Sequence, residues 1–399
     1  MHRLLQGDVG SGKTIVAALA ALTAIEAGAQ VAVMAPTEIL AEQHYLKFKQ
    51  WLEPLGLSVA WLSGSQRKKA KAQNKAALSD GLIQIAVGTH ALFQDDVQFQ
   101  NLGLVIVDEQ HRFGVAQRLA LKNKGADVHQ LMMSATPIPR TLAMSFFADL
   151  DVSVIDELPP GRTPIKTRLV NSVRRSEVEG LVLGACRKGQ QAYWVCPLIE
   201  ESETLQLQTA TETQAALQAA LPELSIGLVH GRMKAAEKAE VMAEFSAGRL
   251  NVLVATTVIE VGVDVPNAAL MVIEHAERMG LAQLHQLRGR VGRGAAASAC
   301  VLLFAEPLGD IAKARLKVIY EHTDGFEIAR QDLNIRGPGE FLGARQSGVP
   351  MLRFANLEED LPLLEAARNI APQLIDERPD IVDAHLARWL ASRESYLGV

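Results

Sequence analysis

A glycine-rich segment near the start of the chain has the residue types that bind phosphate. Residues 7–14 read Gly-Asp-Val-Gly-Ser-Gly-Lys-Thr and fit the pattern G-x-x-x-x-G-K-[ST]. Glycines let successive backbone N–H groups curl around phosphate oxygens, and the N-terminus of a following helix adds its dipole. A plain glycine-rich turn is the alternative interpretation. We predict that this segment binds ATP and Mg²⁺ through Gly7, Asp8, Gly10, Ser11, Gly12, Lys13 and Thr14, with Lys13 on the β- and γ-phosphates and Thr14 on Mg²⁺.

Two adjacent acids supply the carboxylates that phosphoryl transfer requires. The apolar run 104–107 ends in Asp108 and Glu109. If this run is a strand beside the glycine-rich segment, both carboxylates lie at its carboxyl end. We expect Asp108 to hold Mg²⁺ through water and Glu109 to orient or deprotonate the attacking water. A capping acid on a buried strand is the alternative, and His111 taken alone is typical of a structural histidine.

A cluster of arginines late in the chain is a candidate partner for the γ-phosphate. Residues 286–293 read Gln-Leu-Arg-Gly-Arg-Val-Gly-Arg, and the two glycines permit a close approach to another part of the protein. An arginine supplied to the γ-phosphate accelerates phosphoryl transfer by about 10³–10⁵-fold. We therefore assign Gln286, Arg290 and Arg293 to catalysis, with a solvated basic turn as the alternative.

The elements that position these residues follow a βα alternation, which is typical of helices on parallel sheets. The proline-rich stretch 156–164 cannot continue a helix or a central strand and predicts a linker between two α/β halves. The strands expected are 4–5, 30–35, 83–87, 104–107 and 130–133 before the linker, and 191–197, 226–229, 251–255, 268–274 and 299–304 after it. The helices expected in the first half are 14–27, 39–52, 67–79 and 116–121, and helical pattern replaces the alternation after about residue 315.

The amino-acid composition excludes several classes of protein. The 399 residues carry 40 Lys+Arg and 45 Asp+Glu, a formal net charge of −5, and are 48% hydrophobic and 21% charged, which excludes a mainly disordered chain. The acidic balance and the 5% aromatic content argue against coating nucleic acid by bulk charge or stacking, so such binding must use local patches. No run reaches the roughly 18 apolar residues of a membrane span. Cys186, Cys196 and Cys300 lack metal spacing and predict reduced thiols in the cytoplasm.

Several strings, in order, resemble the motifs of superfamily 2 helicases and translocases. They are APTE at 35–38, VGTH at 87–90, DEQH at 108–111, SAT at 134–136, VHGR at 229–232, ATTVIEVGVDVP at 255–266 and QLRGRVGR at 286–293. The resemblance implies an α/β fold of two tandem RecA-like parallel-sheet lobes with ATP bound between them, and a nucleotide contact at Asp264. It also implies that His111, Ser134 and Thr136 relay hydrolysis, and that Thr37, Thr89, His230 and Thr257 contact the DNA sugar-phosphate backbone, which carries no sequence information.

Longer strings narrow the resemblance to the RecG family of branched-DNA helicases. They are DEQHRFGVAQR at 108–118, SATPIPRTLAM at 134–144 and IDELPPGRTPI at 155–165, with DGFEIAR, DLNIRG and GARQSG at 324–330, 332–337 and 343–348. The last three resemble a helical hairpin and loop that this family shares with the transcription-repair coupling factor, where the element couples motor closure to movement on duplex DNA. The resemblance assigns the coupling role to Arg315, Arg336 and Gln346.

The resemblance implies an ATP-dependent helicase that moves on double-stranded DNA and remodels stalled forks and Holliday junctions in recombination and repair. The domains expected are 1–157 and 158–314, the two lobes, and a helical region at 315–399. Branched DNA is the expected partner, a single-strand-binding protein is a further candidate, and we expect a monomer associated with the bacterial nucleoid. Members of the family carry a wedge domain and an adenine-holding element upstream. Neither precedes His2, so we expect the motor and C-terminal parts alone.

Three alternatives stay open: a translocase like the coupling factor, a P-loop motor that acts on protein, and a non-catalytic nucleic-acid-binding module. ATP hydrolysis with and without forked duplex discriminates among these classes, because stimulation by DNA favours a DNA translocase. The basic run at 67–75 is interpreted as a solvated helix face, with phosphate contact as the alternative. His44, Trp61, Trp194 and Met233 are interpreted as packing or surface residues.

Overall fold

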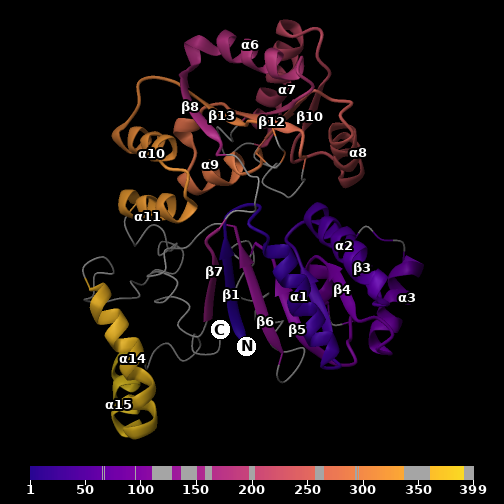
Figure 1. The fold of residues 1–399 in the computed structure, drawn as a ribbon, viewed down its shortest axis with the longest axis vertical. Helices are drawn as coiled ribbons and strands as arrows, with labels where there is room; N and C mark the ends of the chain where they lie inside the picture. The colour runs from indigo at the N-terminus through magenta and orange to yellow at the C-terminus, as the bar shows by residue number, and fades with distance from the viewer. Residues whose placement is uncertain are drawn as a thin grey trace.

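The computed structural model describes residues 1–64, 66, 68–94, 96–109, 128–135, 151–157, 164–196, 203–256, 265–292, 294, 296–336 and 360–390. Two α/β lobes lie one above the other in Figure 1, and C-terminal helices lie beside them. The fold class expected from the sequence, two tandem parallel-sheet lobes with a helical C-terminal region, is confirmed.

The first lobe contains a seven-stranded parallel sheet in the order β3-β4-β2-β5-β6-β1-β7. Its strands are β1 (His2–Gly7), β2 (Gln30–Met34), β3 (Val59–Leu62), β4 (Ile85–Gly88), β5 (Leu102–Val107), β6 (His129–Ser134) and β7 (Asp151–Ile155). The helices α1 (Lys13–Glu26) and α2 (Glu38–Leu52) pack on one face, and α3 (Lys68–Ser79) and the short η2 (His90–Phe93) pack on the other. The buried face of α1 consists of Ala17, Ala18 and Ala21, so this helix lies close to the sheet.

The second lobe contains a six-stranded parallel sheet in the order β10-β11-β9-β12-β13-β8. Its strands are β8 (Lys166–Asn171), β9 (Gln191–Val195), β10 (Ile226–Val229), β11 (Val252–Ala255), β12 (Ala268–Ile273) and β13 (Ala299–Phe304). The helices α6 (Arg175–Cys186) and α7 (Glu203–Ala220) cover one face, and α8 (Ala235–Ser246) and α9 (Leu281–Arg288) cover the other. Both sheets are buried on both faces, which explains their nearly continuous apolar strands.

The two lobes repeat one topology. Six strands of the first sheet, β3-β4-β2-β5-β6-β1, match the second sheet position by position. The match extends to side chains, because Gln30 at the start of β2 and Gln191 at the start of β9 each donate one side-chain N–H bond to a carbonyl near the end of a helix and one to a carbonyl of the loop that follows it. The backbone N–H of each glutamine donates to the carbonyl of an asparagine, Asn101 in the first lobe and Asn267 in the second. The expectation of two similar α/β halves is therefore confirmed.

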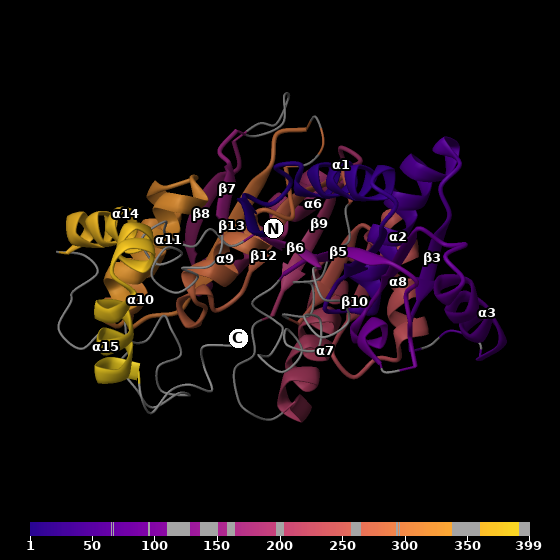
Figure 2. The ribbon, with the colours of Figure 1, turned by 90° about the horizontal axis from the view of Figure 1, so that it is seen from below.

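The helical region follows β13. The helices α10 (Asp310–Glu321) and α11 (Gly325–Arg336) pack against α9 and against each other. The helices α14 (Leu361–Glu377) and α15 (Pro379–Leu390) form a pair beyond them, and Figures 1 and 2 both show this pair at the end of the molecule opposite α3. In the part of the chain that the structure describes, no helix combines the length and the apolar character needed to cross a membrane.

Candidate nucleotide site between the two lobes

The glycine-rich segment forms a tight loop between β1 and α1. Gly10 and Gly12 adopt φ values of 79° and 97°, in the left-handed region that side chains other than hydrogen disfavour. Gly7 meets a different restriction, because a Cβ atom there would lie 2.4 Å from Ser11 Oγ. The first turn of α1 begins at Lys13 and directs backbone N–H groups into the loop. The segment therefore has the geometry of a phosphate cradle at a helix N-terminus.

Two side chains of this loop face its interior. Lys13 Nζ donates hydrogen bonds to the carbonyl oxygens of Gly7 and Asp8, at 2.8 and 2.9 Å. Ser11 Oγ is buried, and no described residue forms a hydrogen bond with it. Thr14 is half-buried, on the first turn of α1. Phosphate oxygens in the loop would accept hydrogen bonds from both the Lys13 ammonium group and the Ser11 hydroxyl.

Asp108 lies at the carboxyl end of β5, as expected, and it has a partner that the sequence did not indicate. Its Oδ2 atom accepts a hydrogen bond from His44 Nε2 at 2.7 Å, and its Oδ1 accepts the backbone N–H of Glu109 at 2.9 Å. His44 lies on the buried face of α2. The interpretation of His44 as a packing or surface residue was therefore incomplete, because its ring is buried and also orients the Asp108 carboxylate.

The electrostatics keep Asp108 ionised. Burial alone would raise the pKa of this carboxyl, but the hydrogen bond and charge of His44, and then the charge of Lys13, hold the pKa below its ordinary value. The contribution from Lys13 requires the glycine-rich loop and the end of β5 to be close in space. An ionised carboxylate, such as that of Asp108, and a hydroxyl, such as that of Thr14 next to Lys13, are oxygen donors of the kind that Mg²⁺ prefers.

The residues that flank Asp108 also lie at this edge. Glu109 has a φ of 51°, which is rare for a residue other than glycine and is typical of a functional turn. Ser134 ends β6, the strand between β5 and β1, and is paired in register with Gln6 just before the glycine-rich loop. The structure thus brings Lys13, Asp108, Glu109 and Ser134 together at the carboxyl ends of neighbouring strands of the first sheet.

The second lobe approaches the same loop through the end of α9. A Cβ atom on Gly289 would lie 2.8 Å from Val9 Cβ, so glycine permits the contact between the two lobes. Gln286 and Arg290, on either side of this contact, are buried. His285, which the sequence did not single out, donates from Nε2 to Asp8 Oδ1 at 2.8 Å. Only the three-dimensional approach of α9 to the loop reveals this pair.

The predicted DNA contacts follow the carboxyl ends of three strands. Thr37 begins α2, with its Oγ1 accepting the backbone N–H of Leu40, and Thr89 is buried, at 3% exposure, after β4. His230 follows β10, where burial first and then the charges of Lys238 and Arg232 lower its pKa. These contacts with DNA stay predictions.

The structure gives less information on the other predicted residues. Arg315 lies on α10, and its Nε atom is buried without a hydrogen bond to any described residue. Arg336 is the last residue of α11. The remaining predicted residues, His111, Thr136, Thr257, Asp264, Arg293 and Gln346, lie outside the described residues.

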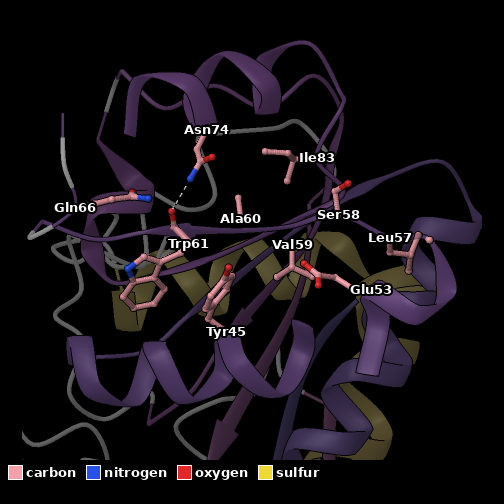
Figure 3. A pocket seen from close by; sticks show the side chains of 11 residues that line it. Tyr45, Glu53, Leu57, Ser58, Val59, Ala60, Trp61, Gln66, Asn74 and Ile83 are labelled. Carbon is pink, nitrogen blue, oxygen red and sulfur yellow. Dashed lines mark hydrogen bonds between the residues drawn. The ribbon is translucent and has the colours of Figure 1, made fainter. Parts of the chain in front are cut away.

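A separate pocket of about 630 Å³ opens beside β3, away from the predicted residues (Figure 3). Tyr45 of α2 and Trp61 of β3 line it, with their ring centroids 5.8 Å apart, and Asn74 of α3 donates to the Trp61 carbonyl at 3.0 Å. None of the residues assigned to nucleotide or DNA lines this pocket.

Three family profiles match consecutive parts of the chain. Residues 2–145 match the DEAD/DEAH box helicase profile, residues 175–295 match the helicase conserved C-terminal domain, and residues 322–389 match the C-terminal part of domain 3 of the ATP-dependent DNA helicase RecG. The profile boundaries follow the two lobes and the helical region. The three predicted domain boundaries themselves stay predictions.

Curated relatives match along almost the whole chain. The ATP-dependent DNA helicase RecG of Acidithiobacillus ferridurans is 60% identical over 396 residues, and that of Escherichia coli K12 is 58% identical over 401 residues. In both comparisons 99% of this chain is covered, but only 58% of the relative. The chain therefore spans somewhat more than half the length of these relatives.

Solved structures agree with this result. A structure of RecG bound to a three-way DNA junction is 49% identical, with a TM-score of 0.74, and the match covers 92% of this chain and 47% of that one. Dbp5 of Saccharomyces cerevisiae, bound to RNA and ADP BeF3, has a TM-score of 0.60 at 16% identity, which shows a shared fold alone.

Proposed function

Because this chain belongs to the RecG family, we propose that it is the motor of an ATP-dependent DNA helicase that translocates on double-stranded DNA. The match of residues 322–389 to RecG domain 3 supports this assignment over a translocase like the transcription-repair coupling factor. The identity of 58–60% to RecG proteins supports it over a P-loop motor that acts on protein. Branched DNA is the proposed substrate, since a RecG relative was solved on a three-way DNA junction.

The observation that carries the proposal is the meeting of three components at one interface. The glycine-rich loop, the ionised Asp108 and the α9 segment of the second lobe all lie there, and the Asp8–His285 hydrogen bond of 2.8 Å joins the lobes. A single-lobe nucleotide-binding protein has no need for an apposed second lobe. Two lobes that share a ligand can open and close as the ligand changes, which is how a motor converts binding into movement.

Each residue has a defined task in this proposal. Bound ATP with Mg²⁺ would supply the phosphoryl group whose transfer to water releases free energy. Lys13 would leave the carbonyls of Gly7 and Asp8 to bind the phosphates, and Thr14, with Asp108 acting through water, would hold the metal. Glu109 orients or deprotonates water, and Arg290, with Arg293 as a further candidate, compensates negative charge from the second lobe. Gln286 is assigned to the same interface. Ser134 ends β6 and pairs in register with Gln6, just before the glycine-rich loop, so a movement of the loop can pass to β6.

Replacement of Lys13 by Ala tests the nucleotide assignment. The variant removes the only charge on the first turn of α1, so we expect DNA-stimulated ATP hydrolysis to be abolished and affinity for the Mg²⁺ complex of AMP-PNP to fall by at least about tenfold. The matched control is Lys49→Ala, at a half-buried position of α2 where the lysine pairs with Glu53, and this variant is expected to hydrolyse ATP normally. Near-normal turnover in Lys13→Ala would overturn the assignment.

The remaining parts of the proposal concern partners and location. Phosphate contacts by Thr37, Thr89, His230 and Thr257 suit a motor that moves along any sequence, because such contacts carry no base information. Contact with a single-strand-binding protein, a monomeric state and a place at the bacterial nucleoid remain predictions from the family resemblance. Stimulation of hydrolysis by forked duplex, with little stimulation by protein substrates, is the result that the proposed function requires.

A further inference from the structure

A continuous series of hydrogen bonds connects the glycine-rich loop to the turn between α10 and α11. Asp8 Oδ1 lies 2.8 Å from His285 Nε2, and His285 Nδ1 lies 3.2 Å from Arg288 Nη2. From there, Arg288 Nη1 donates to the carbonyls of Ile319 and His322, each at 2.8 Å, and Nη2 donates to that of Thr323 at 3.2 Å. His285 and Arg288 are 4% and 3% exposed, so water has little access to the bond between them.

The direction of each bond is determined by chemistry. An arginine guanidinium has donors and no acceptor, so His285 Nδ1 must accept the bond from Arg288. The ring proton of the neutral imidazole then resides on Nε2, which donates to the carboxylate of Asp8. His285 therefore has one donor and one acceptor, both in use, and cannot turn without breaking a contact at each end.

At its first end the series responds to what the loop holds. Asp8 takes part in three ways: its carbonyl accepts Lys13 Nζ, and its carboxylate accepts both the Val9 backbone N–H at 2.7 Å and the His285 ring. A phosphate that attracts Lys13 removes the first of these bonds. Asp8 thus contacts both the lysine of the loop and the second lobe.

At its other end the series fixes an element outside the sheet. Arg288 is the last residue of α9, and its guanidinium joins carbonyls at the end of α10 and in the turn before α11. Each carbonyl would otherwise need another donor, since buried backbone groups are costly to leave unpaired. A displacement of Arg288 would therefore displace the turn between α10 and α11.

We propose that His285 and Arg288 are positioning residues that transmit occupancy of the glycine-rich loop, through Asp8, to the α10–α11 turn. The inference rests on the proposed function in one respect, because it takes an ATP analogue as the occupant of the loop. It assigns tasks to two residues that belong to no phosphate contact. Neither His285 nor Arg288 is a catalytic residue in this proposal.

Hydrogen exchange of this chain with and without AMP-PNP and Mg²⁺ tests the proposal. Affinity is measured first, by calorimetry, and exchange at amides 319–336 is then followed at saturating AMP-PNP. We expect wild type to show a change in exchange rate at the α10–α11 turn within the range of typical allosteric coupling, about five- to 150-fold. Failure to bind AMP-PNP would contradict the proposed function, whereas binding without a change at 319–336 would overturn only this inference.

Two replacements of similar size separate hydrogen bonding from packing. His285→Gln retains an amide N–H for Asp8 and a carbonyl oxygen for Arg288, so it is expected to keep the response. His285→Leu fills the space with no polar atom, so it is expected to bind AMP-PNP within about threefold of wild type and to lose the response at 319–336. Gln283→Ala, at an exposed position of the same helix, is the control and is expected to respond as wild type.

A retained response in His285→Leu would overturn the proposal, as would loss of the response in Gln283→Ala. If His285→Leu does not fold, judged from its thermal transition, Asp8→Ala breaks the series at its first end. In that variant, measured at a saturating AMP-PNP concentration, the response at 319–336 is expected to disappear. Its persistence would equally overturn the inference.

Discussion

Asp108 and Glu274 occupy equivalent positions at the carboxyl ends of β5 and β12, the fourth strand in each sheet order. The backbone N–H of each donates to the last residue of the neighbouring strand at 2.9 Å, and the residue after each has a positive φ. They differ in their partners. Glu274 Oε1 lies 2.5 Å from Nη1 of Arg175, the first residue of α6. The equivalent residue of the first lobe is Lys13, the first residue of α1, which donates to the carbonyls of Gly7 and Asp8. Asp108 therefore stays available for a metal.

This difference gives the first prediction, for Glu274→Ala. Glu274 is buried, and it also accepts the Trp194 indole N–H at 2.9 Å, so its removal takes this acceptor from Trp194 and leaves Arg175 with its bond to Glu179 at 3.1 Å. We expect a loss of about 3 kcal/mol in the free energy of unfolding, at the low end for a buried pair because Arg175 is partly exposed. Urea unfolding followed by tryptophan fluorescence measures it. The exposed pair of Arg187 and Glu223 is the control, and Arg187→Ala is expected to change little. An equal loss in both variants would contradict the prediction.

The second prediction concerns the pH dependence of metal binding in His44→Ala. In wild type the pKa of Asp108 lies below its ordinary value of 3.8, so the carboxylate is fully ionised from about pH 5 to 8. Without His44 the main influence that lowers this pKa is lost, while burial still raises it. Affinity for Mg²⁺-AMP-PNP should then weaken progressively toward pH 5 in the variant relative to wild type.

His44→Gln is the matched control for that measurement, because a glutamine amide can still donate to Asp108. Isothermal calorimetry at several pH values supplies the affinities. Parallel profiles for His44→Ala and wild type would show that His44 does not set the ionisation of Asp108.

A third prediction follows from the contact between Gly289 and Val9. The Cβ atom in Gly289→Ala would lie 2.8 Å from Val9 Cβ, closer than such atoms approach, so the end of α9 must shift away from the glycine-rich loop. Small displacements of catalytic groups reduce turnover steeply, so we expect DNA-stimulated hydrolysis to fall by about 10- to 100-fold. Gly184→Ala is the control, since a Cβ atom there meets open space, and it should hydrolyse ATP as wild type does.

The fourth prediction concerns the three thiols, all in the second lobe. Burial raises the pKa of Cys186 from 9.0 to about 11, and it raises the pKa of Cys196 and Cys300 from 9.0 to about 12. At pH 8 the thiolate fraction of the latter two is about a thousandfold below that of an ordinary cysteine. Alkylation by iodoacetamide should therefore be slow in the native protein and rapid in urea. Native labelling at the rate of an exposed thiol would contradict this.

The same shifts predict a loss of stability in alkali. Between pH 9 and about 12 the unfolded chain releases thiol protons that the folded chain keeps, so the unfolded state is favoured as pH rises. This contribution to the free energy of unfolding is complete below pH 9 and is lost toward pH 12.

The sequence predicted the central strands and the glycine-rich loop, but it missed β3, β7 and β8. These three strands lie at the edges of the two sheets, where one side faces outward and a continuous apolar run is unnecessary. The Lys-Thr-Arg start of β8 illustrates this. In contrast, Asp108 follows a strand buried on both faces, and its position was recognised from the apolar run alone.

The histidines of the site were harder to predict. His44 and His285 lie in helices whose sequence patterns do not indicate their partners, and both partners are distant in sequence, by 64 and 277 positions. Local patterns record which residues alternate between core and solvent. They do not record which helix end will meet which loop, because packing of the two lobes decides that.

The interior place of β1 has a practical consequence for handling the protein. The strand pairs with β6 on one side and β7 on the other, and it enters the sheet at Met1, whose ammonium group lies 2.5 Å from His129 Nδ1. Five strand residues, 2–6, separate Met1 from Gly7 at the start of the glycine-rich loop, a distance of about 20 Å. A fluorophore attached at the amino end of β1 would therefore report from the end of the strand opposite the glycine-rich loop.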